Sequence, residues 1–235
     1  MDFTAQELLN GETFETTLEA DAKQAGVFNP NAQYKPVPMV IGKNDLFPLL
    51  EKELETMQIG EEKRIELEPK DAFGERSAAR IALLSLQEFR KQKMQPIPGL
   101  VIEADGRQGK VQSVSGGRVR VDFNHPLAGK RVAYKLVLRK KIDEKEEQVS
   151  ALLEKFFPHV KPEERKIKIE GEKAEIELPE RLKEKRETEL LKQIVAKTLP
   201  EELEWLKTVE FKENKTEKGE TAGAKADPSK SEKKE

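Results

Sequence analysis

Hydrophobic and polar residues alternate in short segments over the first part of the chain, as they do in strands that bury one face. Residues 64–68 alternate strictly and stop at Pro69, so they predict a half-buried strand. The largely apolar residues 36–42, which end at a glycine, predict another strand. Gly11 follows a short N-terminal segment and predicts a hairpin after it. This part of the chain is therefore expected to form a sheet.

One helix is predicted to cover that sheet, over residues 46–57. Apolar side chains recur there at helical spacing, from Phe47 to Met57. Pro48 falls in the first turn, where its missing N–H leaves no hydrogen bond unmade. A sheet covered by one helix is an α+β arrangement.

Residues 78–124 predict a small separate unit with one short helix. Ser85 and Glu88 have the spacing of a capping box, which predicts the start of that helix. The dipeptides Asp-Gly at 105–106 and Gly-Gly at 116–117 are typical of tight hairpin turns. The unit is therefore expected to be rich in short strands.

Residues 144–212 predict a third module of mixed helices and strands. Apolar residues at helical spacing predict a helix that ends before Pro158, and two alternating segments about Gly171 predict a hairpin. A second amphipathic helix is expected over residues 182–195, with a helix restart at 198–201.

Val209 and Phe211 predict a last strand in this module. A module of this size has a thin core, so we expect its apolar faces to pack against a second copy or against the other domains. Beyond it, residues 213–235 are dominated by Lys, Glu, Gly, Ala and Ser, which predicts a disordered charged tail.

Composition narrows the classes of function. The chain has 235 residues with 43 Lys and Arg against 45 Asp and Glu, a net charge of −2, which argues against a general polyanion binder. The absence of cysteine excludes disulfides, thiolate metal sites and cysteine nucleophiles. There is no apolar run of membrane-spanning length, and the N-terminus lacks the pattern of a signal peptide. We therefore expect a cytoplasmic protein that binds neither nucleic acid nor membrane.

Three short motifs carry a family resemblance. Residues 11–17 read Gly-Glu-Thr-Phe-Glu-Thr-Thr, residues 71–76 read Asp-Ala-Phe-Gly-Glu-Arg, and residues 122–129 read Asp-Phe-Asn-His-Pro-Leu-Ala-Gly. Together they resemble the FKBP-type peptidyl-prolyl cis-trans isomerases, in particular the SlyD-like branch with a domain inserted into the flap. The three-part organisation of the chain resembles the long archaeal type, which adds a C-terminal extension. The motif resemblance covers residues 1–142, and the rest of the chain is interpreted from its residues alone.

The resemblance implies an α+β fold and a division of the chain. An FKBP-like antiparallel sheet wraps on one helix, a small β-rich domain is inserted in the flap, and an α/β module follows. The implied parts are a discontinuous isomerase domain (1–77 and 125–142), an insert-in-flap chaperone domain (78–124), the C-terminal α/β module (144–212) and the tail (213–235).

The implied reaction is rotation about an X–Pro bond, which needs no nucleophile and no cofactor. The barrier is about 18–20 kcal/mol, so the unaided reaction takes tens of seconds. The planar imide is more polar than the twisted one, and a dry apolar pocket therefore favours the twisted form. The expected site is aromatic and aliphatic, with neither a catalytic triad nor a metal ion. His125 is expected to be a turn residue that bonds to backbone, since one histidine makes no metal site.

Several residues match the family's pocket by their place in its motifs. Taken singly, Phe14, Leu50 and Tyr134 would fit an ordinary core better, but their occurrence in motif order favours the pocket. The implied catalytic residues are Phe14, Glu15, Leu46, Phe47, Leu50, Phe73 and Tyr134, and Phe3 and Val37 are implied substrate contacts.

Four of these residues depart from the family pattern. Phe73 lacks the hydroxyl that the family's tyrosine offers to a substrate carbonyl, a loss that costs about 0.5–1.5 kcal/mol, or roughly threefold to tenfold. Glu15 is one methylene longer than the usual aspartate. Leu50 replaces the tryptophan of several relatives, and Val37 replaces a phenylalanine. We therefore expect modest activity on short peptides and a weak response to macrolide inhibitors.

The insert is implied to capture unfolded chains. It offers more apolar residues than so small a unit buries comfortably, and about half of them are expected to form its own core. An exposed apolar surface beside the pocket would raise the local concentration of prolyl bonds. The apolar set is Leu83, Leu84, Leu86, Met94, Ile97, Leu100, Val101 and Ile102, of which Leu84, Met94, Ile97 and Val101 are the candidate client contacts.

Two other functions stay open. One is a holdase chaperone on an FKBP fold with little catalysis, which Phe73 and the short first strand motivate. The other is a translation-associated factor whose charged C-terminal part contacts ribosome or RNA, against which the near-neutral net charge counts. The expected partners are unfolded or nascent polypeptides with X–Pro bonds, and a second copy bound through the C-terminal module.

Overall fold

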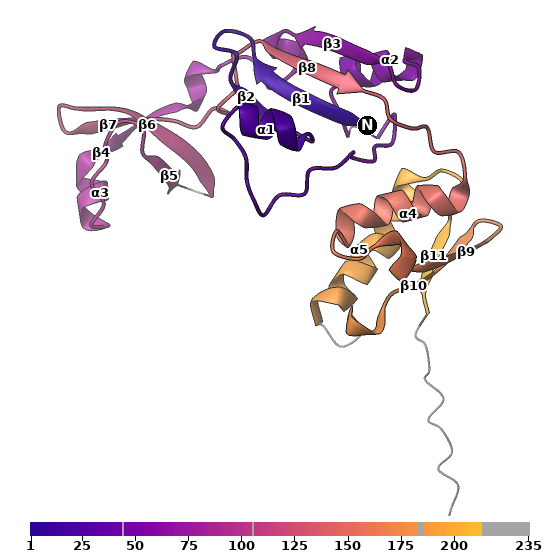
Figure 1. The fold of residues 1–235 in the computed structure, drawn as a ribbon. Coiled ribbons are helices and arrows are strands. Elements are labelled where there is room, and N and C mark those ends of the chain that lie inside the picture. Colours follow the sequence, from indigo (N-terminus) through magenta and orange to yellow (C-terminus); the bar gives the residue numbers. More distant parts are fainter. Residues whose placement is uncertain (44, 105, 183–185, 213–235) are drawn as a thin grey trace, which may run out of the picture. The chain divides into compact units, whose positions relative to one another are not determined.

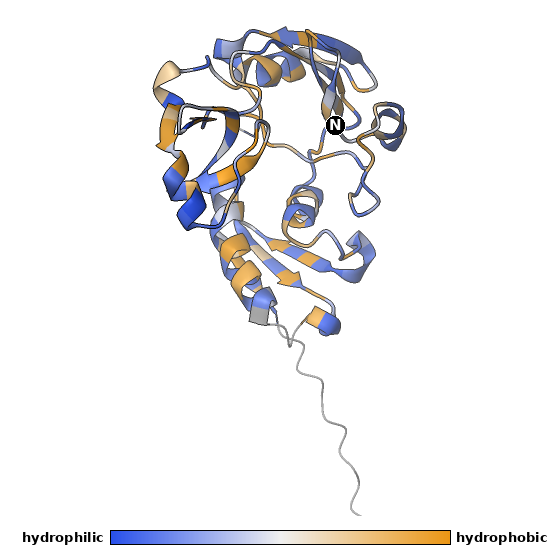
Figure 2. Ribbon diagram, turned by 90° about the vertical axis from the view of Figure 1, so that its left-hand side faces the viewer, coloured by the Kyte–Doolittle hydropathy of each residue, from blue (hydrophilic) through white to orange (hydrophobic). Residues whose placement is uncertain are grey.

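A computed structural model describes residues 1–43, 45–104, 106–182 and 186–212 of the chain (Figure 1). The chain forms two compact units, residues 1–144 and residues 145–235. The predicted disordered tail lies outside the described residues. In Figure 2, hydrophobic and hydrophilic residues alternate along the strands and around the helices, so that elements have an apolar side. No helix within the described ranges is long and apolar enough to cross a membrane.

The first unit is built on a four-stranded antiparallel sheet in the order β2-β1-β8-β3 (Figure 1). Tyr134 stands at its centre, opposite Ala5 on one side and Ile65 on the other. Gly11, at φ 69°, turns the predicted hairpin between the first two strands. The strands are β1 (Asp2–Glu7), β2 (Thr13–Thr16), β3 (Glu62–Leu67) and β8 (Val132–Val137).

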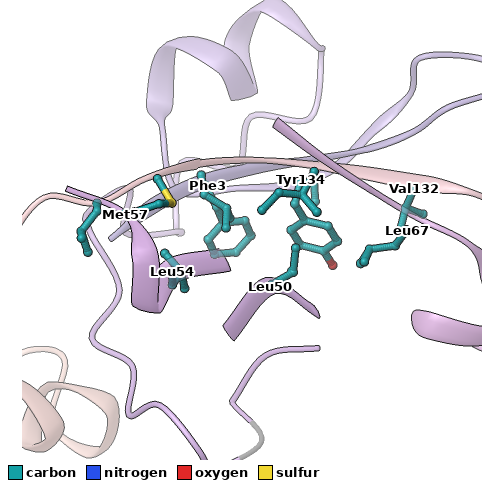
Figure 3. Packing of buried hydrophobic residues seen from close by; sticks show 11 residues of the cluster. Phe3, Leu50, Leu54, Met57, Leu67, Val132 and Tyr134 are labelled. Carbon is teal, nitrogen blue, oxygen red and sulfur yellow. The ribbon is translucent and has the colours of Figure 1, made fainter. Parts of the chain in front are cut away.

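One face of this sheet is covered by the predicted helix, α2 (Pro48–Thr56) (Figure 3). Leu50 and Leu54 of α2 are buried against the sheet in the same cluster as Leu136. The helix begins two residues later than predicted because Phe47 precedes a proline and is extended, with ψ 139°. The short helix α1 (Glu19–Gln24) and the 3-10 turn η1 (Pro69–Asp71) complete this part.

The strand predicted over residues 36–42 is wrong. Val37 exchanges two backbone hydrogen bonds with Met1, at 2.8 and 2.9 Å, but the segment has no strand assignment. Pro36 and Pro38 flank that contact and have no N–H to donate, so a ladder cannot continue there.

The insert contains a second four-stranded antiparallel sheet, in the order β4-β7-β6-β5. The predicted turn at 116–117 joins β6 and β7, and Gly116 and Gly117 have φ values of 56° and 73°, as a tight hairpin requires. Of the other predicted turn, Gly106 has a φ of 68°, and Asp105 lies outside the described residues. The elements are η2 (Ala78–Arg80), β4 (Ile81–Ser85), α3 (Leu86–Lys91), β5 (Val101–Ala104), β6 (Arg107–Ser115) and β7 (Arg118–Asp122).

The predicted start of α3 at Ser85 is confirmed, but the strand β4 before it was missed. Ser85 caps the helix, since its Oγ accepts the N–H of Gln87 at 3.2 Å. The predicted capping box placed that bond at Glu88, one residue further on. Strand β4 was not predicted, because its run of apolar residues does not alternate with polar ones.

The second unit is a three-stranded sheet in the order β11-β10-β9 with two helices. The hairpin predicted about Gly171 is present as the antiparallel pair β9–β10, and the predicted last strand adds to β10 in parallel. The elements are α4 (Lys145–Phe156), η3 (Pro162–Glu164), β9 (Lys166–Glu170), β10 (Lys173–Glu177), η4 (Glu180–Leu182), α5 (Arg186–Glu202) and β11 (Thr208–Phe211).

The second helix of this unit differs from its prediction at both ends. Leu182 belongs to η4, so it is not part of α5. The helix restart predicted at 198–201 is wrong, because α5 runs through Pro200 without a break. Leu199 and Leu203 are buried on either side of that proline, and the N–H of Leu203 donates to the carbonyl of Leu199 at 2.9 Å. Core packing therefore outweighs the single backbone bond that the proline removes.

Candidate active site

Four aromatic rings contact one another in a closed ring beside the apolar core between the first sheet and α2. Phe14 and Phe47 stand opposite each other, and each contacts both Phe73 and Tyr134, at centroid distances between 5.3 and 6.2 Å. The four ring planes meet nearly at right angles, at 77–81°, which is a favoured edge-to-face geometry. We call these four residues the aromatic box.

Local structure explains how each ring reaches the box. Phe14 is the extra residue of a bulge in β2, since Ala5 faces Glu15 and Gln6 faces Thr13. A bulge breaks the strict alternation of a strand and redirects its side chains. Phe47 is held extended by the proline after it, and Phe73 follows η1 in a turn. Three segments that are far apart in the sequence thus converge on Tyr134 of β8.

The box stands on the core of the isomerase sheet. Leu50 is fully buried, and Figure 3 shows it beneath the ring of Tyr134, whose hydroxyl points away from the strand. Phe3 lies beside the same ring at 6.1 Å. Val37 and Leu46 are partly buried against this cluster. Eight of the nine residues that the family motifs implied therefore belong to one apolar cluster, and these are Phe3, Phe14, Val37, Leu46, Phe47, Leu50, Phe73 and Tyr134.

The ninth residue, Glu15, is exposed and acts on the box through its charge. Burial raises the pKa of the Tyr134 phenol to about 12, and the nearby Glu15 carboxylate adds to the shift. The phenol is protonated at neutral pH, as an unshifted phenol also is, and the shift extends this range into alkaline pH. Since Phe73 has no hydroxyl, Tyr134 supplies the phenolic donor of the box.

His125 contributes a contact that sequence reasoning missed. Its Nδ1 accepts the N–H of Leu127 at 3.2 Å, which confirms the predicted turn role. Its ring also stacks on Phe73, with centroids 4.5 Å apart and planes 2° from parallel. The two residues lie in different motifs, and no local pattern shows that those motifs pack together.

The two chain segments that connect the sheets are fastened to each other. Asn124 accepts the N–H of Ser77 at 2.9 Å and donates to its carbonyl at 3.0 Å. Asp122 accepts the backbone N–H and the side-chain amide of Asn124 and pairs with Arg76. Burial alone would raise the pKa of Asp122, but these hydrogen bonds and the guanidinium charge outweigh it and lower the pKa. Hydrogen bonds and one ion pair therefore hold together the two segments that lead into and out of the insert.

A cavity of about 950 Å³ lies beside the aromatic box, between it and the insert. Phe14 lines it from the isomerase side, together with the ion-paired Glu7 and Lys130. Val101 and Lys110 line it from the insert. The cavity is therefore shared by Phe14 of the box and by residues of the insert.

The apolar residues of the insert divide into two equal groups. Leu84, Leu86, Leu100 and Ile102 belong to the insert's own core, whereas Leu83, Met94, Ile97 and Val101 have 37–63% of their surface exposed. The expectation that about half would be buried is thus confirmed. Leu84 is the exception among the four candidate client contacts, because it faces the core of the insert.

Comparison with known proteins agrees with this geometry. The family model described as FKBP-type peptidyl-prolyl cis-trans isomerase matches residues 4–93. The model FKBP26, IF domain, matches residues 82–127, and the model FKBP26 C-terminal matches residues 145–216.

Individual relatives point the same way. The FKBP-type 16 kDa peptidyl-prolyl cis-trans isomerase of Escherichia coli is 33% identical over 104 residues, which cover 43% of this chain and 70% of the relative. The chain belongs to the FKBP-type peptidyl-prolyl cis-trans isomerases. The short-type isomerase of Methanocaldococcus jannaschii is 29% identical over 56% of this chain and 83% of its own length, and the SlyD of Helicobacter pylori is 28% identical over 50% and 67%. This FKBP-type protein is therefore a rotamase, and its α+β fold is as predicted.

Proposed function

We propose that this isomerase accelerates proline-limited protein folding, with the aromatic box as its catalytic pocket and the insert as a chaperone surface. The observation that carries the proposal is the four-ring circuit of Phe14, Phe47, Phe73 and Tyr134. We assign the isomerase domain to residues 1–77 and 125–142 and the insert to 78–124. The C-terminal module is assigned to 144–212, and cytoplasmic location remains a prediction.

In the proposed mechanism the proline ring of the substrate enters the box. The aromatic faces provide an apolar environment, which favours the less polar twisted imide over the planar one. The Tyr134 hydroxyl donates to a substrate carbonyl and holds the chain on one side of the rotating bond. No proton transfer and no covalent step is needed. Leu50 and Phe3 support the rings from behind and keep the site dry.

The insert raises activity on proteins by holding an unfolded segment near the box. Leu83, Ile97 and Val101 expose 56–63% of their surface, and Val101 also lines the cavity that reaches Phe14. A client that contacts these side chains would present its prolyl bonds at a raised local concentration. This effect requires no contact between the insert and the proline itself.

Refolding of a protein limited by proline isomerisation tests the proposal. Phe47→Ala should lower the catalysed rate about tenfold to a hundredfold, the effect expected from losing the burial of one phenylalanine. Replacing residues 78–124 by a short turn should leave the rate on a tetrapeptide unchanged and remove most of the acceleration on the protein. Leu49→Ala, two residues further along in the first turn of α2 and 38% exposed, is the matched control and should behave as wild type.

Two outcomes would contradict the proposal. If the wild type prevents aggregation but does not accelerate the slow phase, the chain is a holdase on an isomerase fold. If Phe47→Ala retains full tetrapeptide activity, the aromatic box is not the catalytic pocket.

We further propose that the C-terminal module joins two copies of the chain. Leu190 and Ile194 lie one helical turn apart on α5 and are 61% and 41% exposed. Sedimentation of the full chain should give a dimer, and Leu190→Asp with Ile194→Asp should give a monomer. A monomeric wild type would remove this proposal without affecting the isomerase assignment.

A further inference from the structure

The sheet of the insert has two faces of opposite character. One face forms the core, with Val111, Val119 and Val121 buried under α3. The side chains that alternate with them point to the other side. The exposed residues of this outer face include Leu83, Val101, Lys110, Arg118 and Arg120.

Register places these residues next to one another. Arg120 of β7 lies opposite Leu83 of β4, and Lys110 of β6 lies opposite Val101 of β5. Arg118 precedes Arg120 by two positions on β7, so the two side chains point to the same side about 7 Å apart. The outer face therefore has basic side chains in its middle strands and apolar side chains on its edge strands.

The basic side chains of the outer face are exposed to solvent. None of Lys110, Arg118 and Arg120 has an ion-pair partner among the residues that the structure describes. Asp122 is also on this side, but it is buried and paired with Arg76. Glu103 is the exposed acid of this side and lies on the edge strand β5. The wider insert is basic too, since residues 78–124 have eight Lys and Arg against four Asp and Glu in a chain of net charge −2.

The outer face also continues into the open space beside the box. Lys110 and Val101 line the cavity that Phe14 lines from the isomerase side. A polypeptide whose proline occupies the aromatic box can thus extend through the cavity onto the outer face without crossing a buried region.

We propose that the outer face selects client segments that combine acidic and apolar residues. The proposal rests on the proposed function of the insert and specifies which clients it prefers. In an extended segment, acidic residues two positions apart match the spacing of Arg118 and Arg120. Apolar residues beside them contact Leu83 and Val101.

A single-stranded nucleic acid fits this face less well than a polypeptide does. Proteins that bind single strands without sequence preference stack the bases on aromatic side chains. The residues that define the outer face include no aromatic ring, and its apolar members are aliphatic. An acidic polypeptide satisfies both the charges and the aliphatic contacts.

Binding of labelled unfolded peptides to the full-length protein tests the proposal. Three peptides of one apolar sequence are used, with glutamate, glutamine or lysine at alternate positions. The glutamate peptide should bind about tenfold more tightly than the lysine peptide at low salt, as expected from two or three exposed ion pairs. The difference should shrink at about 0.5 M salt, where exposed charges are screened.

Charge reversal on the outer face should reverse this preference. Arg118→Glu with Arg120→Glu should make the lysine peptide the better ligand and leave tetrapeptide isomerisation unchanged. The matched control is Arg90→Glu with Lys91→Glu, which makes the same charge change on α3, on the core side of the sheet. The control should keep the preference for glutamate.

The outcomes separate this inference from the proposed function. If all three peptides bind wild type equally, client capture stands and the acidic preference is wrong. If the α3 control loses the preference as fully as the outer-face variant, only net charge matters and the outer face is not the site. If oligouridylate displaces the glutamate peptide more strongly than an unlabelled copy of that peptide, the partner is a nucleic acid. If no peptide binds while tetrapeptides are still isomerised, client capture by the insert is itself wrong.

Discussion

The two sheets of the first unit have the same number of strands and one covering helix each, but they differ in how far their apolar residues are buried. Each has four antiparallel strands with one helix on one face. The isomerase sheet buries eleven apolar residues in its main cluster and the insert buries five, so the larger core can draw its neighbouring rings into a closed box. The insert has too little interior for its apolar residues and leaves half of them exposed. Core size therefore decides whether apolar side chains become a pocket or a contact surface.

The two sheets also treat their charges differently. On the isomerase sheet, acids at the strand ends are buried and paired, as Asp2 is with Arg139 and Glu7 with Lys130. On the insert, the basic residues of the outer face are exposed, and the part of the chain that the structure describes offers them no such partner. The isomerase sheet thus satisfies its charges internally, whereas the insert leaves charges available to a client.

The largest difference in stability between the two sheets is expected from Gly109→Ala in the insert. A Cβ at Gly109 would lie 2.7 Å from both the Phe123 ring and a methyl group of Val121. Overpacking of this kind costs about 1–3 kcal/mol, which is a large share of what so small a core supplies. Hydrogen exchange should show faster opening of β6 and unchanged protection of β8. Ser113→Ala, at an exposed position of β6, is the control.

The same variant can also show that the two sheets are not independent. If Gly109→Ala speeds exchange in β8 as much as in β6, the two sheets unfold together. The insert would then be a part of the isomerase core rather than a weaker sheet beside it.

An intermediate effect is expected from Tyr134 at alkaline pH. The unfolded phenol ionises near pH 10, while the pKa in the folded protein is about 12. Between these values the folded state binds more protons than the unfolded state, so the free energy of unfolding falls as pH rises. Tyr134→Phe should flatten that fall by up to one proton equivalent between pH 10 and 12, measured by denaturant unfolding. Equal slopes in the two proteins would show that the phenol is not shielded by the box.

The smallest effect is expected from His125→Ala. Removing the ring that stacks on Phe73 loses an aromatic contact of about 0.5–1.5 kcal/mol, so tetrapeptide isomerisation should fall roughly twofold to tenfold. His125→Phe keeps a ring and removes the acceptor for the N–H of Leu127, whereas His125→Asn keeps a side-chain acceptor and removes the ring. If the asparagine variant is the more active of the two, the turn rather than the stack supports the box.

Much of the secondary structure could be predicted from local pattern. The helix α2, the hairpins about Gly11, Gly116 and Gly171, and the last strand all follow from periodicity and turn residues. These signals are local, since a side chain's face is set by its position in a helix or strand. The residues of the aromatic box were also grouped by the family motifs, whereas the ring-to-ring contacts among them follow from no local pattern.

Two secondary-structure predictions were wrong because hydrogen bonding and core packing outweighed the local pattern. Residues 36–42 look like a strand, but two prolines stop the ladder. Pro200 looks like a break, but Leu199 and Leu203 are anchored in the core on both sides of it. In each case a contact or a missing donor outweighs the intrinsic preference of the segment.

Local patterns in the sequence predict most of the elements and their apolar sides, and the family motifs point to the residues that gather around Tyr134. Only the tertiary structure decided that Phe14, Phe47, Phe73 and Tyr134 close a circuit, that His125 stacks behind Phe73, and that the basic side chains of β6 and β7 share one exposed face. The physical reason is the distance along the chain over which each kind of interaction acts. Periodicity and turn chemistry act over a few residues, whereas a pocket is made by side chains from segments that meet only after the core has packed.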